Sequence, residues 1–364
     1  MNIKDVINVI EEIAPLAYAE DFDNVGLLVG NHDTKVTNVL VTLDTLESIV
    51  DEAIEKDCNL IISFHPIVFS GLKRFNGNNY VEKVVMKAIK NDIAIYAMHT
   101  ALDNSINGVN DRICQQLGLE NRKILIPKKG VIKKLTTYVP TKDLDEVRTA
   151  LFKAGAGNIG NYDECSFTVE GTGTFKGNDE SKPVIGQKGI THFEAETQLG
   201  VTFPKHIEGQ VINALLKAHP YEEVAYEVVS LDNTYQHLGM GMIGELPVAM
   251  PEKAFLELLK QKMNVSVIKH SVLLGKPIKN VAVLGGSGSF AIENAKRAGA
   301  DVFVTADMKY HQFYQAEGQL VIADIGHYES EQFTKNLLVE HLSKKIHNFA
   351  IILSEVNTNP IKYS

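Results

Sequence analysis

The sequence predicts an α/β fold in which two facing α/β lobes are interrupted by a ferredoxin-like α+β insertion. The chain has 364 residues, which exceeds a comfortable single core, so we expect either two domains or one large domain with an insertion. Helices and strands alternate in the first and last parts of the chain, whereas the middle has strands of alternating pattern that are rich in Thr, Glu and Gly. The predicted boundaries are 1–129 for the first lobe, 130–232 for the insertion and 233–364 for the second lobe.

The first lobe alternates strands with amphipathic helices. Its strands are short, continuous apolar runs, which are typical of a sheet covered by helices on both faces. Its helices repeat apolar residues at a spacing of three and four. In chain order we expect a helix at 6–13, a strand at 39–43, a helix at 46–54, a strand at 59–64, a helix at 81–89 and a strand at 93–98.

The second lobe repeats this rhythm, which suggests two related lobes facing each other. A Gly-rich segment at 285–288 is expected to form a tight turn from a strand into a helix, although it could also present N–H groups to a phosphate. The predicted elements are a strand at 280–284, a helix at 290–295, a strand at 301–305, a short helix at 312–315, a strand at 320–325 and one helix at 327–346.

The middle block is predicted to be a compact α+β module. It reads as strand, helix, strands, helix and strand over about a hundred residues, which resembles a ferredoxin-like module. The elements include a strand at 135–140, a helix at 144–154, a strand at 165–170, a helix at 206–218 and a strand at 225–229.

Composition limits the classes of function. The net charge of −9 argues against a general nucleic-acid-binding face. No apolar run is long enough to span a bilayer and no signal peptide is evident, so we expect a cytoplasmic protein. The cysteines Cys58, Cys114 and Cys165 are too widely spaced for a disulfide framework or a Cys-based zinc motif.

Three predicted strands each end at a histidine, namely His65, His99 and His327. His99 is followed four residues later by Asp103, and His327 by Glu331. Open α/β sheets bind ligands at the carboxyl ends of their strands, so these side chains can converge. A single strand-end histidine is more often structural, but the three together favour a metal site for zinc, iron or manganese.

Four motifs together resemble the GTP cyclohydrolase I type 2 family, whose eukaryotic relatives are called Ngg-interacting-factor-like proteins. These motifs are Phe-Asp-Asn-Val-Gly-Leu at 22–27, Phe-His-Pro at 64–66, His-Thr-Ala-Leu-Asp at 99–103 and Gly-His-Tyr-Glu-Ser-Glu at 326–331. The resemblance covers nearly the whole chain, because the insertion is similar to the CutA-like, PII-like module of the longer bacterial members.

The resemblance implies a two-metal centre and a toroidal hexamer built from three dimers. It makes His65, Asp103, His327 and Glu331 the metal ligands, with Glu331 bridging the ions. The family usually has a His-His pair before the proline, but this chain has Phe64 before His65. Phenylalanine cannot bind a metal, so the number of ions per subunit is expected to be one or two.

His99 is either a compensating ligand or a residue that orients a ligand, and we favour the second role. His311 follows the strand at 301–305 and is our candidate for an acid/base or phosphate contact, with Asp307, Lys309 and Tyr310 beside it. Asp23 and Asn24 are expected to shape a turn near the site.

The predicted function is that of a metal-dependent hydrolase acting on a nucleotide or related heterocycle. For the family reaction, GTP would yield formate and dihydroneopterin triphosphate, with Glu331, His99 and His311 as catalytic candidates. The alternative is a non-catalytic metal-binding ring protein that senses a metabolite or recruits a partner. The expected partners are a small nucleotide-like ligand and further copies of the chain, without a membrane or general nucleic-acid binding.

Overall fold

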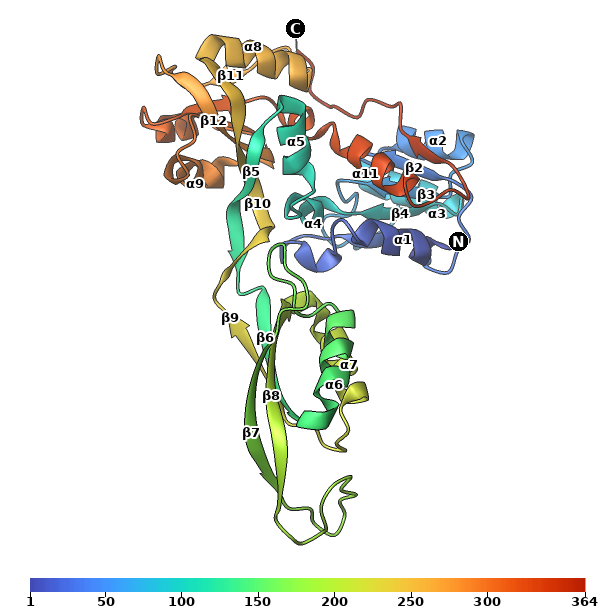
Figure 1. Ribbon diagram of the computed structural model, residues 1–364. Helices are drawn as coiled ribbons and strands as arrows, with labels where there is room; N and C mark the ends of the chain where they lie inside the picture. The colour runs from blue at the N-terminus through green and yellow to red at the C-terminus, as the bar shows by residue number, and fades with distance from the viewer. Residues whose placement is uncertain (364) are drawn as a thin grey trace. The chain divides into compact units, whose positions relative to one another are not determined.

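The computed structural model describes residues 1–363 and has a mixed α/β fold, which confirms the predicted fold class. The chain forms two compact units, one made of residues 1–127 and 236–364 and the other of residues 128–235 (Figure 1). The first unit holds two sheets and the second unit holds one.

The first sheet of the larger unit has the strand order β1-β4-β3-β2-β15. The four strands from β4 to β15 are parallel, and β1 runs antiparallel to β4. All residues of β2, β3 and β4 are buried, as expected for a sheet covered on both faces. The strands are β1 (Gly26–Val29), β2 (Val39–Thr42), β3 (Leu60–Ser63), β4 (Ala94–Ala97) and β15 (Ile351–Leu353).

Helices cover both faces of this sheet. Helices α1 and α11 pack on one face, where Ile10 and Leu338 join the core with Val41. Helices α2 and α3 pack on the other, where Val50 and Val84 surround Ile61. The helices are α1 (Ile3–Glu11), α2 (Glu47–Glu55), α3 (Tyr80–Lys90) and α11 (Thr334–Ser343), with the 3₁₀ turn η1 (Leu16–Tyr18) after α1.

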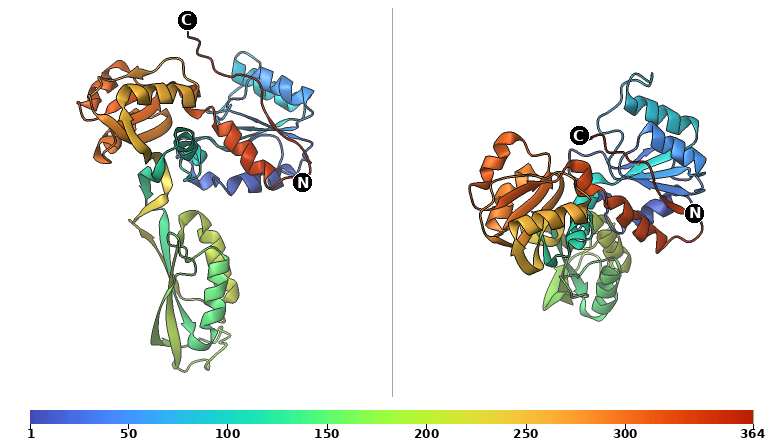
Figure 2. Two further views of the ribbon diagram at one scale, coloured as in Figure 1. Left: turned by 45° about the horizontal axis from the view of Figure 1, so that its top comes forward. Right: turned by 90° about the horizontal axis from the view of Figure 1, so that it is seen from above.

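The second sheet has the order β11-β14-β13-β12-β10-β5, with β12, β13 and β14 parallel. Its strands from the last part of the chain are the orange arrows in Figure 2. Each sheet contains one strand from the other part of the chain. β5 lies before the insertion but belongs to the second sheet, and β15 lies near the carboxyl terminus but belongs to the first. The strands are β5 (Glu120–Lys129), β10 (Thr234–Pro251), β11 (Lys269–His270), β12 (Pro277–Ser287), β13 (Val302–Ala306) and β14 (Val321–Asp324).

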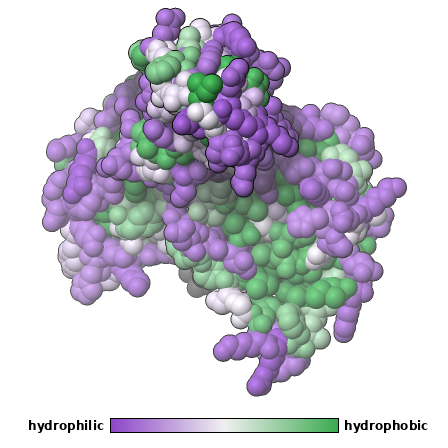
Figure 3. Space-filling model, turned by 90° about the horizontal axis from the view of Figure 1, so that it is seen from below, coloured by the Kyte–Doolittle hydropathy of each residue, from purple (hydrophilic) through white to green (hydrophobic). Residues whose placement is uncertain are grey.

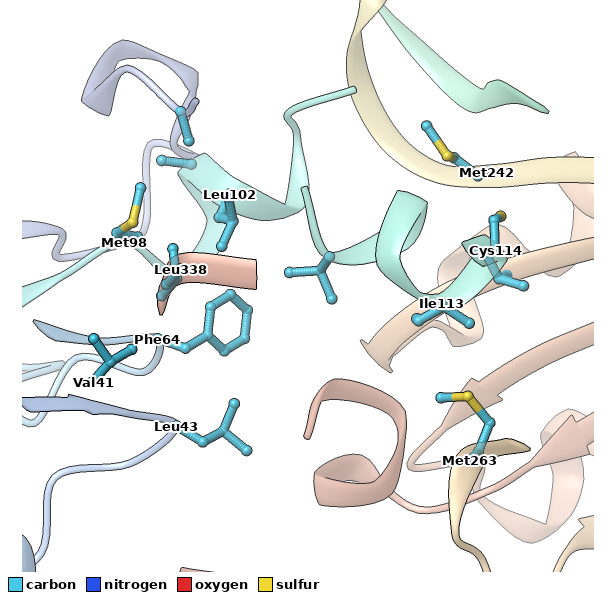
Figure 4. Packing of buried hydrophobic residues seen from close by; sticks show 14 of the residues in the cluster. Val41, Leu43, Phe64, Met98, Leu102, Ile113, Cys114, Met242, Met263 and Leu338 are labelled. Atoms are coloured by element: carbon cyan, nitrogen blue, oxygen red, sulfur yellow. The ribbon is translucent and has the colours of Figure 1, made fainter. Parts of the chain in front are cut away.

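This sheet is also covered on both faces. Ile113 of α5 and Phe255 of α8 pack against one face. Ile113 shares a hydrophobic cluster with Phe64 and Leu338, which pack against the first sheet (Figure 4). Ile292 of α9 packs against the other face. A single core therefore joins the two sheets. The helices are α5 (Val109–Leu117), α8 (Glu252–Met263), α9 (Ile292–Arg297), η4 (Ser289–Ala291) and η5 (Tyr310–Ala316).

Two short helices, α4 (His99–Asp103) and α10 (His327–Glu331), follow the ends of β4 and β14. The sequence predicted one helix from residue 327 to 346, and this was wrong, because α10 ends at Glu331 and α11 begins at Thr334. The Gln332 side chain donates to the carbonyl of Glu329 at 3.1 Å. That carbonyl would otherwise accept the next bond of a continuous helix, so the side chain competes with helix propagation.

The smaller unit is a four-stranded antiparallel sheet with the order β7-β8-β6-β9. Helices α6 and α7 pack on one face through a separate core that includes Leu151, Phe203 and Leu215. Its elements in chain order are β6 (Ile132–Pro140), η2 (Thr141–Asp143), α6 (Leu144–Lys153), β7 (Phe167–Phe175), β8 (His192–Pro204), η3 (Lys205–Ile207), α7 (Glu208–Ala218) and β9 (Tyr226–Leu231).

The surface is mixed in character. Hydrophilic residues and small hydrophobic patches alternate in Figure 3, and one extended hydrophobic area lies at the centre and lower right of that view. None of the helices in residues 1–363 has the length and apolar content needed to cross a membrane. The three cysteines are free, and two of them, Cys58 and Cys114, are buried.

Candidate metal centre

The candidate centre is built at the carboxyl ends of strands from both sheets of the larger unit. Asp44, His65 and His99 follow β2, β3 and β4 of the first sheet. Asp307 and His327 follow β13 and β14 of the second. In each sheet these strands are parallel neighbours, so their ends place the side chains at one edge.

Glu331 lies at the middle of the cluster. Its Oε2 atom is 3.2 Å from Nε2 of His65 and 3.3 Å from Nε2 of His327. The ligand atoms of these three residues all lie within 4.8 Å of one another, and Glu331 is buried. Helix α10 supplies both His327 and Glu331, whereas His65 comes from the other sheet.

Each of the three strand-end histidines donates its Nδ1 proton to an aspartate. An ionised carboxylate can only accept, so these contacts fix the tautomer and the ring orientation and leave Nε2 free. Metal-binding histidines are commonly held in this way. The pairs are His65 with Asp44 at 2.8 Å, His99 with Asp23 at 2.8 Å and His327 with Asp307 at 2.7 Å.

Two of these residues have unusual backbone conformations. His99 has φ of +29° and Asp307 has φ of +56°, although neither is glycine. Such conformations cost free energy and persist where surrounding contacts impose them. Asp23 holds the His99 segment, since it also accepts a bond from the Thr100 amide at 3.0 Å. Asp307 accepts bonds from both Ser287 and His327.

The charged groups of the cluster shift one another's pKa values. Burial opposes protonation of His65, but Asp44 and Glu331 outweigh it and raise its pKa to about 10. For His327, burial is likewise outweighed by Glu331 and Asp307, which raise the pKa to about 9. Burial would raise the pKa of Glu331, yet His327 and His65 lower it to about 2. Without a metal, the carboxylates therefore hold positive charge on both imidazoles.

Asp103 is the fourth predicted ligand. It lines the same pocket as His327 and Glu331 but lies outside their 4.8 Å group. Burial and the negative charge of Glu331 raise the pKa of Asp103 well above its usual value. Its Oδ1 atom is buried and has no hydrogen-bond partner among the described residues.

Gly285 and Gly286 form the wall opposite Glu331. They belong to the end of β12, so the strand runs further than predicted and the expected tight turn into the helix lies at Gly288. Gly286 has φ of +66°, and a Cβ atom there would lie 2.5 Å from Oε1 of Glu331. The Gly286 amide donates to Oγ of Ser330 on α10 at 2.9 Å. Glycine is thus required for the close approach of α10 to the strand.

A pocket of about 240 Å³ opens onto this cluster. It brings predicted site residues from both sheets together, including His99, Asp103, His327 and Glu331. The remaining lining residues are Phe22, Thr100, Asn110, Met240, Leu284, Gly285, Gly286, Ser287 and Phe290.

Two residues that the sequence singled out, Phe64 and His311, do not line this pocket. Phe64 is fully buried and packs in the core with Leu102 and Leu338 (Figure 4). Its ring centroid is 5.7 Å from that of His99, in an edge-on arrangement. His311 lies on η5 between Tyr310 and Tyr314 and does not line the pocket. Its catalytic role stays a prediction.

Sequence reasoning missed Asp44 altogether, and it assigned Asp23 to a turn. Asp44 follows the buried strand β2, so the strand-end rule that found the histidines could have found it. Asn110 was also missed. It lies on α5, and its Oδ1 accepts the amide proton of Gly285 at 3.0 Å, a contact with no sequence signal.

The residues present fit a divalent metal ion. Oε2 of Glu331 is buried without a hydrogen-bond partner among residues 1–363, because neither imidazole contact has hydrogen-bond geometry. An unpartnered buried carboxylate oxygen is costly unless a cation binds it. Imidazole nitrogen with carboxylate oxygen is a ligand set suited to zinc, iron or manganese.

Comparison with known proteins decides the family. The model of the family Duf34/NIF3 (NGG1p interacting factor 3) matches residues 1–360. The chain belongs to the Duf34/NIF3 family. A Bacillus subtilis (strain 168) protein called GTP cyclohydrolase 1 type 2 homolog is 40% identical over 369 residues, covering 100% of this chain and 99% of that protein.

Solved structures of similar proteins agree with this fold. The crystal structure of a Bacillus cereus protein related to NIF3 has a TM-score of 0.88 at 39% identity, covering 100% of this chain and 99% of that one. A Staphylococcus aureus protein has a TM-score of 0.80 at 30% identity, with the same coverage. These matches confirm the family resemblance and the α/β class.

Proposed function

We propose that this Duf34/NIF3 protein is a metal-dependent hydrolase of a nucleotide or related heterocycle. The observation that carries the proposal is the position of Glu331 Oε2, 3.2 Å and 3.3 Å from the free nitrogens of two anchored histidines. A site open to a pocket differs from a structural metal site, which is usually closed by four protein ligands. The names of the relatives, which contain the word homolog, support the reaction class only by analogy.

His65, His327, Glu331 and Asp103 would hold one or two divalent ions, with zinc, iron and manganese as candidates. When bound, such an ion lowers the pKa of a coordinated water to about 7 and so provides a nucleophile near neutral pH. Asp44 and Asp307 keep Nε2 of His65 and His327 directed toward Glu331.

His99 is the proposed proton carrier at Nε2. Its Nδ1 is occupied by Asp23, and it lines the pocket beside Thr100. The burial of Asp23 is outweighed by its bonds to His99 and Thr100, which lower its pKa to about 2, so it remains ionised and keeps its bond to Nδ1 of His99. We keep His311 as a second candidate for proton or phosphate contact.

The second candidate function is a non-catalytic metal-binding protein that senses a metabolite. It is favoured by Phe64, since a buried phenylalanine occupies the position of the family's usual histidine and cannot bind an ion. The CutA-like, PII-like character of residues 130–232, inferred from the resemblance, fits either function.

We further propose that the chain assembles as a hexamer, as the family resemblance implies. The continuous hydrophobic area on one face is the kind of surface that subunit contacts cover (Figure 3).

The deciding experiment is metal analysis of protein purified without added metal, followed by measurement of formate release from a nucleotide panel. Glu331→Gln should lose both metal and activity. Glu329→Gln is the matched control, because Glu329 is buried on the same helix but bonds to Asn359. Bound metal without turnover of any nucleotide would favour the sensor.

A further inference from the structure

The mouth of the pocket carries two exposed aromatic side chains. Phe22 is 66% exposed and Phe290 is 56% exposed, and both line the pocket. They come from separate segments, the turn before β1 and the 3₁₀ turn after β12. Large apolar side chains left in water beside a polar site are typical of ligand contacts, and aromatic faces favour planar rings.

The pocket has few groups that would bind a phosphate. No Lys or Arg is among its lining residues within the described chain, whereas Asp103 and Glu331 line it. Asp23 and Asp307 bond to the pocket histidines His99 and His327, and Asp44 bonds to His65 of the same cluster. The carboxylates of the cluster carry at least as much charge as two divalent ions, so no net positive charge is left over to hold a triphosphate.

The neutral hydrogen-bond donors that line the pocket already donate to other groups of the protein. The Gly285 and Gly286 amides donate to Asn110 and to Ser330 at 3.0 and 2.9 Å, so this strand end does not present them to a ligand. The hydroxyl groups of Thr100 and Ser287 donate to Asp23 and Asp307. A phosphate would have to break these bonds, of which three anchor a histidine or α10 and the fourth joins β12 to α5.

We propose that the pocket accepts an unphosphorylated planar heterocycle, a purine base or nucleoside, whose ring contacts Phe22 and Phe290. This inference deepens the proposed function and rests on it for the reaction. The apolar side chains of Met240 and Leu284 add to a lining suited to a ring and not to a polyanion.

The test compares guanosine with GTP as ligands of the metal-loaded, full-length protein, using isothermal titration calorimetry at constant free metal. Guanosine should bind at least about tenfold more tightly than GTP. Phe290→Leu should weaken guanosine binding about tenfold, because a base-aromatic contact is lost. Phe75→Leu is the control, since Phe75 is 54% exposed but does not line the pocket.

The outcomes separate this inference from the proposed reaction. Tighter binding of GTP, or guanosine binding that Phe290→Leu and Phe22→Leu leave unchanged, would overturn the inference and leave the hydrolase proposal intact. Binding of neither ligand by protein that retains its metal would also overturn it. Phe290-dependent guanosine binding without formate release would support the inference about the ligand and refute hydrolysis of that ligand.

Discussion

At the scale of residues, the centre is a set of imidazoles oriented by carboxylates. A histidine with one nitrogen bonded to an aspartate presents its other nitrogen in a fixed direction, which lowers the entropic cost of binding an ion. The cost of this arrangement is the burial of Asp103 and Glu331 with unpartnered oxygens. A bound cation would relieve that cost.

Metal binding should release protons. The metal-free pKa values of His65 and His327 are raised to about 10 and about 9, so both carry a proton at pH 7 that a metal must displace. Affinity should therefore rise as pH increases from 6 to 8, by up to about 100-fold per pH unit if two protons leave. Calorimetry in buffers of different ionisation enthalpy measures the number released.

In that experiment His347→Gln should behave like the unaltered protein, because His347 is exposed and lies outside the cluster. An affinity that does not change between pH 6 and 8 would contradict the prediction.

The aspartates that bond to the histidines should affect metal affinity although they do not bind the metal. Asp307→Asn would remove the charged acceptor of His327 Nδ1, so metal affinity should fall about 10- to 100-fold. A competition titration with a chelator measures this. Asp301→Asn alters the opposite end of β13, where Asp301 accepts backbone amides, and should leave metal affinity unchanged. Equal losses in the two variants would point to general destabilisation.

At the scale of elements, strand ends and the short helices after them position the site. Helix α10 approaches β12 through Gly286, whose amide bonds to Ser330, and this contact brings Glu331 between the two histidines. The break after Glu331 separates α10 from α11. The first carries ligands, and the second packs Leu338 and Leu342 in the core.

Gly286→Ala should reduce metal binding sharply and lower the free energy of unfolding by about 1 to 3 kcal/mol. The added methyl group would lie 2.5 Å from Oε1 of Glu331 in a backbone conformation that alanine disfavours. Chelator competition and denaturant unfolding measure the two effects.

Gly299→Ala is the matched control, since Gly299 has φ of +75° but a Cβ atom added there would meet no described atom within 4 Å. It should lose a similar amount of stability and keep its metal. Full metal binding by Gly286→Ala would exclude the proposed close approach.

At the scale of the whole molecule, one hydrophobic core holds the two sheets of the larger unit together. Phe64 of the first sheet and Met263 of α8 belong to the same cluster (Figure 4). The exchange of β5 and β15 ties each sheet to a segment from the other end of the chain. Ligands far apart in sequence, such as His65 and His327, are thereby kept a few ångströms apart.

We expect six copies per particle in solution. The family resemblance implies this assembly, and a continuous hydrophobic surface would be covered by it (Figure 3). Light scattering coupled to gel filtration measures the mass, with dilution as the control for weak association. A monodisperse monomer at micromolar concentration would contradict the prediction.

Periodicity and composition were sufficient to predict the α/β class, most helices and strands, and the strand-end histidines. Runs such as Leu60–Ser63 are buried on both faces, so their apolar character is a local signal that needs no knowledge of the partner strands. The motif set also identified the family, which the match over residues 1–360 confirmed.

The sequence by itself determined which residue types stand at the ends of the buried strands. Only the tertiary structure decided how they are paired. Asp23 with His99 and Asp307 with His327 are contacts between separate segments, and no periodicity encodes them. The role of Gly286 is likewise a matter of which helix packs against it. Secondary structure follows from local patterns, whereas a site depends on distances between segments that only the packed core fixes.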